Sequence, residues 1–336
     1  MMVVENFEHR HAGHCESGTL ASLLRHHGLD LSEPMVFGIG GGLFFLHMPY
    51  VRMGGIPLTA YRDAPRTIIK NVCKRLGVRM RQHRYRNPEQ GMRALDEFLA
   101  SGRPVGLQTC VFWLPYFPPD MRFQFNAHNL VAYGKRGEDY LISDPVAEHP
   151  VTCPAPDLKR ARFAKGIFAP KGLIYYPDLV PRDPDLPGAV RVALRHTVKR
   201  MLDVPMPFLG VRGIRSLAKQ MERWPDKHGP ERATIWVGSV VRMQEEIGTG
   251  GAGFRFMYSA FLQEASELLE LPALAEAARQ MTETGDRWRE FAVQGALLCK
   301  GHEQGAQVYR ELADRLRDCA DREERIFRLI KQALPR

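Results

Sequence analysis

The sequence lacks the features that assign many proteins to a class at once. Its six cysteines, at positions 15, 73, 110, 153, 299 and 319, form no Cys-x-x-Cys pair, which argues against a zinc ribbon or a small disulfide framework. No apolar run approaches the length needed to cross a bilayer, and no basic segment leads into an apolar one near the first residue. We therefore expect a cytoplasmic protein that does not bind membranes and whose cysteines are mostly free thiols.

Signatures of nucleotide binding are also missing. The glycine-rich stretches at residues 38–45 and 248–256 match neither the dinucleotide fingerprint nor the Gly-Lys-Ser/Thr of a P-loop. The net charge of +9 is compatible with nucleic acid, but the basic residues are dispersed through mixed-charge segments rather than gathered into a stripe. We expect no nucleic-acid partner and no bound cofactor, and an acidic protein partner fits the charge as well.

The first part of the chain carries both helical and extended patterns. Helical periodicity predicts helices within 15–27, 67–80 and 91–102. Short runs that are rich in β-branched and aromatic residues and bounded by Gly, Pro and Asp predict strands within 103–109, 128–134, 139–145 and 172–177. We therefore predict an α+β domain over residues 1–180.

A proline-rich segment marks a boundary. Prolines interrupt all periodicity between residues 175 and 188, and strand signals almost disappear beyond it. Because 336 residues exceed what one hydrophobic core usually serves, a second domain is expected here. We predict an all-α domain over residues 185–336. The sequence leaves homo-oligomerisation open.

Cys15 is the first candidate nucleophile. It stands at the start of the helix predicted over residues 15–27, where unpaired backbone N–H groups and the helix dipole favour a thiolate. The alternative is a small buried residue that merely begins a helix. A nucleophilic role requires a histidine to accept the thiol proton and a third group to orient that histidine.

His128 and Asp144 meet this requirement. His128 begins one predicted strand and Asp144 ends the next, with a turn at "GKRGED" between them. On a hairpin, residues placed in this way come close together, so Asp144 can bind one ring nitrogen of His128 while the other faces a thiol. A strand histidine without such a partner is more often a packing or surface residue.

The order of these residues resembles that of the papain-like fold. "HNLVAYG" and "SDP" are similar to segments of the bacteriocin-processing peptidases attached to ABC transporters. "HCESGTL", "LSEPMVFGIGGGL" and "FNAHNL" resemble the butirosin biosynthesis protein H N-terminal family, over roughly residues 7–150. Residues 185–336, with "GTGGAGFRFMYSAFLQEA", resemble the helical domain of unknown function that often accompanies that family.

The resemblance implies an acyltransferase of specialised metabolism. Such an enzyme moves an acyl or aminoacyl group from the phosphopantetheine thioester of an acyl carrier protein to a small amine, through an acyl-cysteine. Carried over to this chain, Cys15 is the nucleophile, His128 the general base and acid, and Asp144 the orienting carboxylate. Two alternatives stay open: a cysteine peptidase or amidase with the same triad and water as acceptor, and a binding module without activity.

One expected group is missing from the motif. Papain-like proteases carry a glutamine upstream of the nucleophile as an oxyanion donor, and residues 1–14 contain none. The backbone N–H of Cys15 supplies one donor. Gln108 and the turn at Gly40 and Gly41 are the candidates for the second.

Four further residues are candidates for substrate binding. His14 adjoins the nucleophile, and although His9, His11, His14 and Cys15 have the right chemistry for zinc, their spacing is poor and we expect no metal. Trp113 and Tyr116 belong to an aromatic segment before His128 that forms either an acyl pocket or a core loop. Arg255 begins a helix that could receive an anionic group. The helical domain is a candidate lid and a candidate surface for the carrier protein or the acceptor.

Overall fold

The computed structural model describes residues 2–334, in which no helix is both long and apolar enough to cross a membrane. Contacts divide the chain into two compact units. The sheet unit comprises the residues up to Val36 together with Pro65–Asp185, and the helical unit comprises Phe37–Ala64 together with the residues from Leu186 onward. The two continuous domains expected from the sequence therefore differ from these units, because residues 37–64 belong to the helical unit.

The sheet unit is built on seven strands in the order β4-β9-β5-β6-β7-β8, with β1 beside β6. Every pairing is antiparallel. The strands are β1 (Met2–Val3), β4 (Arg79–His83), β5 (Val105–Thr109), β6 (His128–Arg136), β7 (Asp139–Ser143), β8 (Val151–Pro154) and β9 (Ile174–Leu179). All four predicted strands are confirmed, as β5, β6, β7 and β9. The strands β4 and β8 were not predicted. In β4 the reason is that its exposed basic run carries no apolar alternation.

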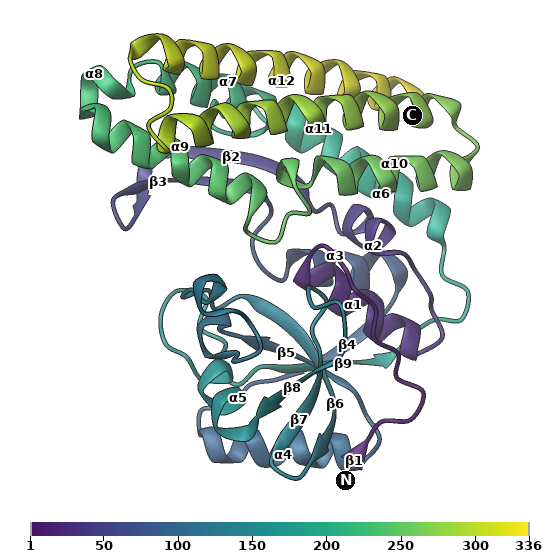
Figure 1. Ribbon diagram of the computed structural model, residues 1–336. Helices are drawn as coiled ribbons and strands as arrows, with labels where there is room; N and C mark the ends of the chain where they lie inside the picture. Colours follow the sequence, from purple (N-terminus) through teal and green to yellow (C-terminus); the bar gives the residue numbers. More distant parts are fainter. Residues whose placement is uncertain (1, 335–336) are drawn as a thin grey trace. The chain divides into compact units, whose positions relative to one another are not determined.

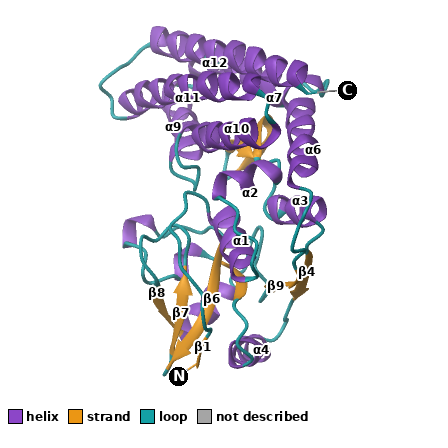
Figure 2. Ribbon diagram, turned by 90° about the vertical axis from the view of Figure 1, so that its right-hand side faces the viewer, coloured by secondary structure: helices purple, strands orange, loops and turns teal. Residues whose placement is uncertain are grey.

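Five helices accompany these strands. They are α1 (Cys15–His26), α2 (Glu33–Ile39), α3 (Thr67–Leu76), α4 (Pro88–Ala100) and α5 (Ala155–Arg162), and the chain passes from the sheet unit into the helical unit within α2. The predicted helical spacing of Leu20, Leu23 and Leu24 gives α1 a fully buried stripe. This helix packs against β5 and β6, the second of which is labelled beside it in Figure 2, and it thereby brings its first residue to the sheet.

The helical unit contains seven α-helices among the described residues. They are α6 (Leu186–Val198), α7 (Gly210–Met221), α8 (Trp224–His228), α9 (Pro230–Glu245), α10 (Arg255–Leu269), α11 (Pro272–Cys299) and α12 (Ala306–Ala333). The helices α11 and α12 are the longest, with 28 residues each, and run side by side (Figure 1). The prediction of a helical C-terminal part is confirmed.

A hairpin from the first part of the sequence completes the helical unit. It consists of β2 (Leu43–Met53) and β3 (Ile56–Arg62), joined by Gly54 and Gly55, whose φ angles of 59° and 83° favour glycine. Phe45 and Tyr61 meet at 5.4 Å between ring centroids, and Tyr61 lies 5.5 Å from the ring of Trp288 in α11. The hairpin therefore belongs to the core of the helical unit. This is why a single boundary in the sequence does not separate the two units.

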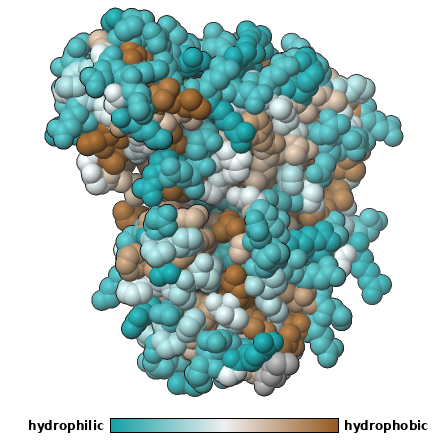
Figure 3. Space-filling view, in the orientation of Figure 1, coloured by the Kyte–Doolittle hydropathy of each residue, from teal (hydrophilic) through white to brown (hydrophobic). Residues whose placement is uncertain are grey.

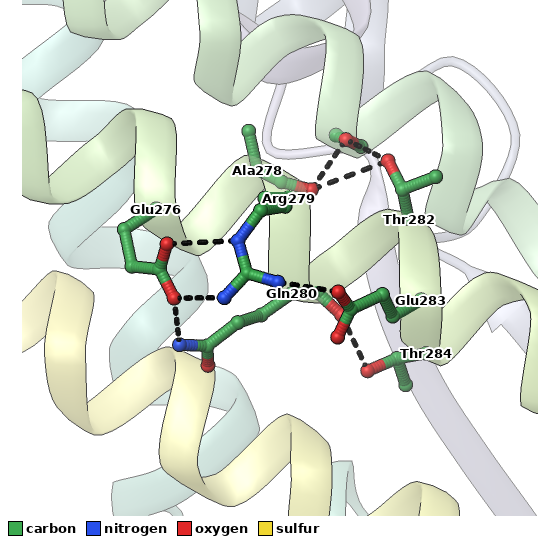
Figure 4. A network of polar contacts seen from close by, with 8 residues as sticks. Glu276, Ala278, Arg279, Gln280, Thr282, Glu283 and Thr284 are labelled. Carbon is green, nitrogen blue, oxygen red and sulfur yellow. Dashed lines mark hydrogen bonds and ion pairs between the residues drawn. The ribbon is translucent and has the colours of Figure 1, made fainter.

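The outward side of α11 is polar and internally paired. Arg279 donates to Glu276 at 2.6 Å and also binds Glu283 (Figure 4). Thr282, on the same helix, bonds to the hydroxyl of Ser259 in α10 at 2.7 Å. Figure 3 shows a largely hydrophilic surface with scattered hydrophobic residues.

Candidate active site

Cys15 is the first residue of α1 and is 5% exposed. His14 caps the helix, since its side chain accepts from the backbone N–H of Ser17 at 3.4 Å. The thiol therefore stands at the positive end of the helix dipole. His14, a candidate for substrate binding, is buried and acts as the helix cap.

His128 and Asp144 are brought together by the hairpin of β6 and β7. His128 begins β6, and Asp144 directly follows β7, whose Ser143 pairs with Val131. The Nε2 atom of His128 lies 2.6 Å from Oδ2 of Asp144, and both side chains are buried. The side chain of Cys15 is among the groups that raise the pKa of the same imidazole. The structure thus joins His128 and Asp144 by a hydrogen bond, and Cys15 lies near enough to His128 to act on its charge.

The electrostatics favour a charged imidazole. Burial by itself lowers the pKa of His128, but the carboxylate of Asp144 and the hydrogen bonds to Asp144 and Cys15 outweigh it and raise the pKa to about 10. The carboxylate of Asp144 therefore favours the protonated form of His128. An imidazolium beside a cysteine is the arrangement that nucleophilic cysteine chemistry uses.

Tyr116 contacts this site in a way that the sequence did not indicate. Its hydroxyl donates to Oδ2 of Asp144 at 2.7 Å. The ring of the following residue, Phe117, meets the His128 ring edge-on with centroids 5.6 Å apart. Tyr116 therefore hydrogen-bonds to the partner of His128, whereas the sequence placed it in a segment that forms either an acyl pocket or a core loop.

Two carboxylates near Cys15, the half-buried Glu33 and the buried Glu16, were missed by the sequence analysis. Glu33 accepts from the backbone N–H groups of Gly13 and His14, each at 2.8 Å, and from the hydroxyl of Ser17 at 3.0 Å. Burial raises the pKa of Glu33. Glu16 accepts from the N–H groups of Arg66 and Ile69, at 2.9 and 3.2 Å, where α3 begins. No local sequence signal identifies such acceptors, because their donors come from distant segments.

Gln108 does not join the site, and the roles of Gly40 and Gly41 as oxyanion donors stay predictions. The side-chain amide of Gln108 donates to the carbonyls of Asn126 at 2.9 Å and Phe168 at 2.8 Å, so both of its N–H groups are used. The assignment of Gln108 as an oxyanion donor is therefore wrong. Gly40 and Gly41 belong to the helical unit and not to the unit that holds Cys15.

Arg255 is not available to an external anion. It is fully buried, and its Nε and Nη2 atoms donate to the two carboxylate oxygens of Glu323 at 2.9 and 3.1 Å. The indole N–H of Trp288 donates to the same carboxylate at 2.7 Å. The expectation that Arg255 binds an anionic substrate group is wrong, because a bidentate partner already neutralises the guanidinium.

The histidines before α1 have protein partners. His9 lies 2.8 Å from the hydroxyl of Ser143 and 3.1 Å from the carbonyl of Ala147. Within residues 2–334 no three His, Cys, Asp or Glu side chains are grouped so that they could hold a metal ion. His9 therefore fastens the segment before Cys15 to the end of the β6–β7 hairpin.

A groove lies on the outer side of the segment that precedes His128. Its volume is about 430 Å³, and the guanidinium of Arg160 stacks over Trp113 at 5.4 Å from the ring centroid. The residues that line it are Phe112, Trp113, Pro115, Pro119, Arg122, Asp157 and Arg160. Trp113 thus lines a surface groove, and its role in substrate binding stays a prediction.

Comparisons with known proteins give two family matches. Residues 14–145 match the model described as butirosin biosynthesis protein H, N-terminal, and residues 156–330 match a domain of unknown function (DUF4872). No curated protein matches the chain. Among solved structures, a Bacillus anthracis protein described as C39-like peptidase matches with a TM-score of 0.36 and 14% identity, covering 54% of this chain and 98% of that one.

Proposed function

Because the chain belongs to the family that joins a butirosin biosynthesis protein H N-terminal region to the DUF4872 domain, we propose that it is a cysteine-dependent acyltransferase. The observation that carries the proposal is the buried hydrogen bond between His128 and Asp144, with Cys15 at the N-terminus of α1 acting on the same imidazole. The donor is an acyl or aminoacyl thioester on the phosphopantetheine of an acyl carrier protein, and the acceptor is a small amine.

The first half-reaction forms an acyl-enzyme. The thiolate of Cys15 attacks the carbonyl carbon of the thioester, and the backbone N–H of Cys15 donates to the developing oxyanion. The tetrahedral intermediate collapses by breaking the bond to the carrier sulfur. His128 protonates that sulfur as it leaves, so the carrier departs as a free thiol and His128 becomes neutral.

The second half-reaction regenerates the enzyme. The amine attacks the acyl-Cys15 carbonyl, and neutral His128 takes the proton that the amine loses. Collapse of the second tetrahedral intermediate releases the amide and the thiolate of Cys15, now paired again with the His128 imidazolium. Asp144 keeps its hydrogen bond to Nε2 throughout, so the other ring nitrogen stays directed at the reacting atoms.

Intact-mass measurement tests the proposal. Incubation with acyl-carrier thioesters should add one acyl group to the wild-type chain, and Cys15→Ala should abolish the adduct because Cys15 is the thiol beside His128. Cys299→Ala is the matched control, since Cys299 is the exposed cysteine of the described residues and the one most open to non-specific acylation. This variant should acylate like the wild type.

The fate of the adduct separates transfer from hydrolysis. We expect the acyl-Cys15 adduct to decay faster as amines are added, with the amide as product. Decay in buffer at a rate that no amine changes, together with efficient cleavage of peptides, would instead identify a cysteine peptidase or amidase. Absence of any adduct on Cys15 with both kinds of substrate would leave only the role of a binding module.

A further inference from the structure

Asp144 is held by three donors, one of which is a removable side-chain hydroxyl. Oδ2 of Asp144 accepts from Nε2 of His128 at 2.6 Å and from the hydroxyl of Tyr116 at 2.7 Å. Oδ1 accepts from the backbone N–H of Val146 at 3.2 Å. The hydroxyl of Tyr116 and the imidazole of His128 therefore share one oxygen of a fully buried carboxylate.

We propose that Tyr116 is a positioning residue that fixes the carboxylate of Asp144 and, through it, the orientation of the His128 ring toward Cys15. The inference rests on the proposed function, which assigns His128 and Asp144 to catalysis. It gives Tyr116 a role that requires the hydroxyl, whereas a packing role would require only the ring.

The segment around Tyr116 is braced for this purpose. Arg122 donates from Nε to the carbonyl of Phe117 at 2.6 Å and from Nη2 to the carbonyl of Pro115 at 2.5 Å. These carbonyls lie on either side of Tyr116 in the chain. Because the charged guanidinium of Arg122 binds the carbonyls on both sides of Tyr116, it holds the backbone at Tyr116 in one conformation and keeps the hydroxyl directed at Asp144.

The titratable groups that act on His128 are Asp144, at the end of β7, and Cys15, at the start of α1. Tyr116 faces Asp144 and, more distantly, Cys153 of β8. Burial and the neighbouring carboxylate raise the pKa of Tyr116 well above its ordinary value, so its hydroxyl remains a donor throughout the useful pH range.

The sign of the effect follows from charge sharing. A hydroxyl that donates to Oδ2 withdraws part of the negative charge that would otherwise attract the His128 imidazolium. Without it, the carboxylate attracts the imidazolium more strongly, and His128 releases its proton at higher pH. A residue that only packs against the loop does not change this titration.

The test is the NMR titration of His128 in full-length protein carrying ¹³C-labelled histidine. Cys15→Ala serves as the background, because it removes the coupled titration of the thiol, and His128→Gln assigns the signal by its disappearance. We expect Tyr116→Phe to raise the inflection of His128 by at least about half a pH unit. An inflection that stays in place or moves downward overturns the proposal.

Tyr140→Phe is the matched control. Tyr140 donates to Oδ1 of Asp96 at 2.6 Å, which is the same kind of bond in the core of the same unit, but Asp96 does not contact His128. This variant should leave the inflection where it is. An equal shift in Tyr140→Phe would show that loss of any buried tyrosine hydroxyl perturbs His128, and the proposal would fail.

A second variant keeps the test open if Tyr116→Phe does not fold. Site-specific 3-fluorotyrosine at position 116 retains the ring and makes the hydroxyl a stronger donor, so it should lower the inflection of His128. A shift in the opposite direction contradicts the proposal. Neither titration uses a substrate, so the role of Tyr116 and the proposed acyl transfer can fail separately. If the expected shifts are seen but the wild-type chain forms no acyl-Cys15 adduct, the role of Tyr116 is upheld and only acyl transfer is contradicted.

Discussion

At the scale of single residues, the environment of Cys15 is made by groups that are not reactive themselves. His14 caps the helix, and Glu33 gathers the N–H groups of Gly13 and His14 together with the Ser17 hydroxyl. These bonds hold the backbone immediately before the nucleophile. The reactive geometry therefore depends on a half-buried acceptor that never needs to touch a substrate.

Glu33→Gln should destabilise this arrangement. An amide offers one oxygen, and its NH₂ group would face donors that now meet the second carboxylate oxygen. A buried donor left without an acceptor costs about 1–3 kcal/mol, and the displaced backbone should also slow the alkylation of Cys15 by iodoacetamide. Urea unfolding and alkylation rates measure the two effects.

The matched control for this prediction is Glu89→Gln. Glu89 is exposed and pairs with Lys159 at the surface, so the variant loses the same charge without orphaning buried donors. It should change neither the urea midpoint nor the alkylation rate. If Glu33→Gln behaves like Glu89→Gln, the Glu33 carboxylate does not hold the segment before Cys15.

At the scale of elements, the helical unit is joined internally by one buried ion pair. Arg255 begins α10, and Glu323 lies on α12, with Trp288 of α11 donating to the same carboxylate. Both charged side chains are 0% exposed. One carboxylate thus links three helices, and its loss would leave a buried guanidinium without a counter-charge.

Glu323→Gln should therefore be strongly destabilising. Breaking a buried pair by neutralising one partner costs about 3–5 kcal/mol. Replacing both partners, as in Arg255→Met with Glu323→Leu, should restore much of the loss because no buried charge remains. Chemical unfolding followed by circular dichroism compares the variants.

An exposed pair provides the contrast. Glu276→Gln breaks the surface contact with Arg279 on α11 (Figure 4), and it should leave the unfolding midpoint unchanged. A double variant as unstable as Glu323→Gln would mean that Arg255 and Glu323 contribute through shape rather than charge.

At the scale of the whole molecule, the helical unit incorporates a segment that precedes most of the sheet unit in the chain. Its hairpin carries His47, which is 0% exposed and lies 2.9 Å from the hydroxyl of Thr59. Burial lowers the pKa of His47 from 6.5 to about 4, although Gln220 opposes the shift. The folded unit therefore keeps His47 neutral over a range in which an unfolded chain protonates it.

This difference predicts an acid-sensitive helical unit. Between pH 6.5 and about 4 the unfolded chain binds the proton and the folded one does not, so the stabilisation is complete above pH 6.5 and is lost as the pH falls toward 4. The loss from this residue amounts to at most roughly 3 kcal/mol. His47→Gln should flatten the dependence of stability on pH in this window.

Tryptophan fluorescence can follow the helical unit alone. Three of the four tryptophans lie in it, at 224, 236 and 288, so Trp113→Phe removes the signal of the sheet unit. His302→Gln is the matched control, because His302 is exposed in the same unit. A pH dependence that persists unchanged in His47→Gln would show that other groups cause it.

Much of the fold was readable from local pattern. The leucine spacing of α1, the apolar runs of β5, β6, β7 and β9 and the helical C-terminal part express periodicities of neighbouring residues. The family resemblance, carried by motifs such as "HCESGTL", is confirmed by the two family matches. The selection of Cys15, His128 and Asp144 likewise needed only residue types and their places on a helix and a hairpin.

Only the tertiary structure decided which polar side chains already have a hydrogen-bond or ion-pair partner within the protein. Gln108 and Arg255 looked available in sequence, but their partners, Phe168 and Glu323 among them, lie 60 and 68 residues away. The hydrogen bond of Tyr116 to Asp144 and the membership of residues 37–64 in the helical unit are of the same kind. By itself the sequence determined the periodic elements and the reactive residue types, because these depend on near neighbours, whereas partners and burial depend on contacts between distant segments that exist only after folding.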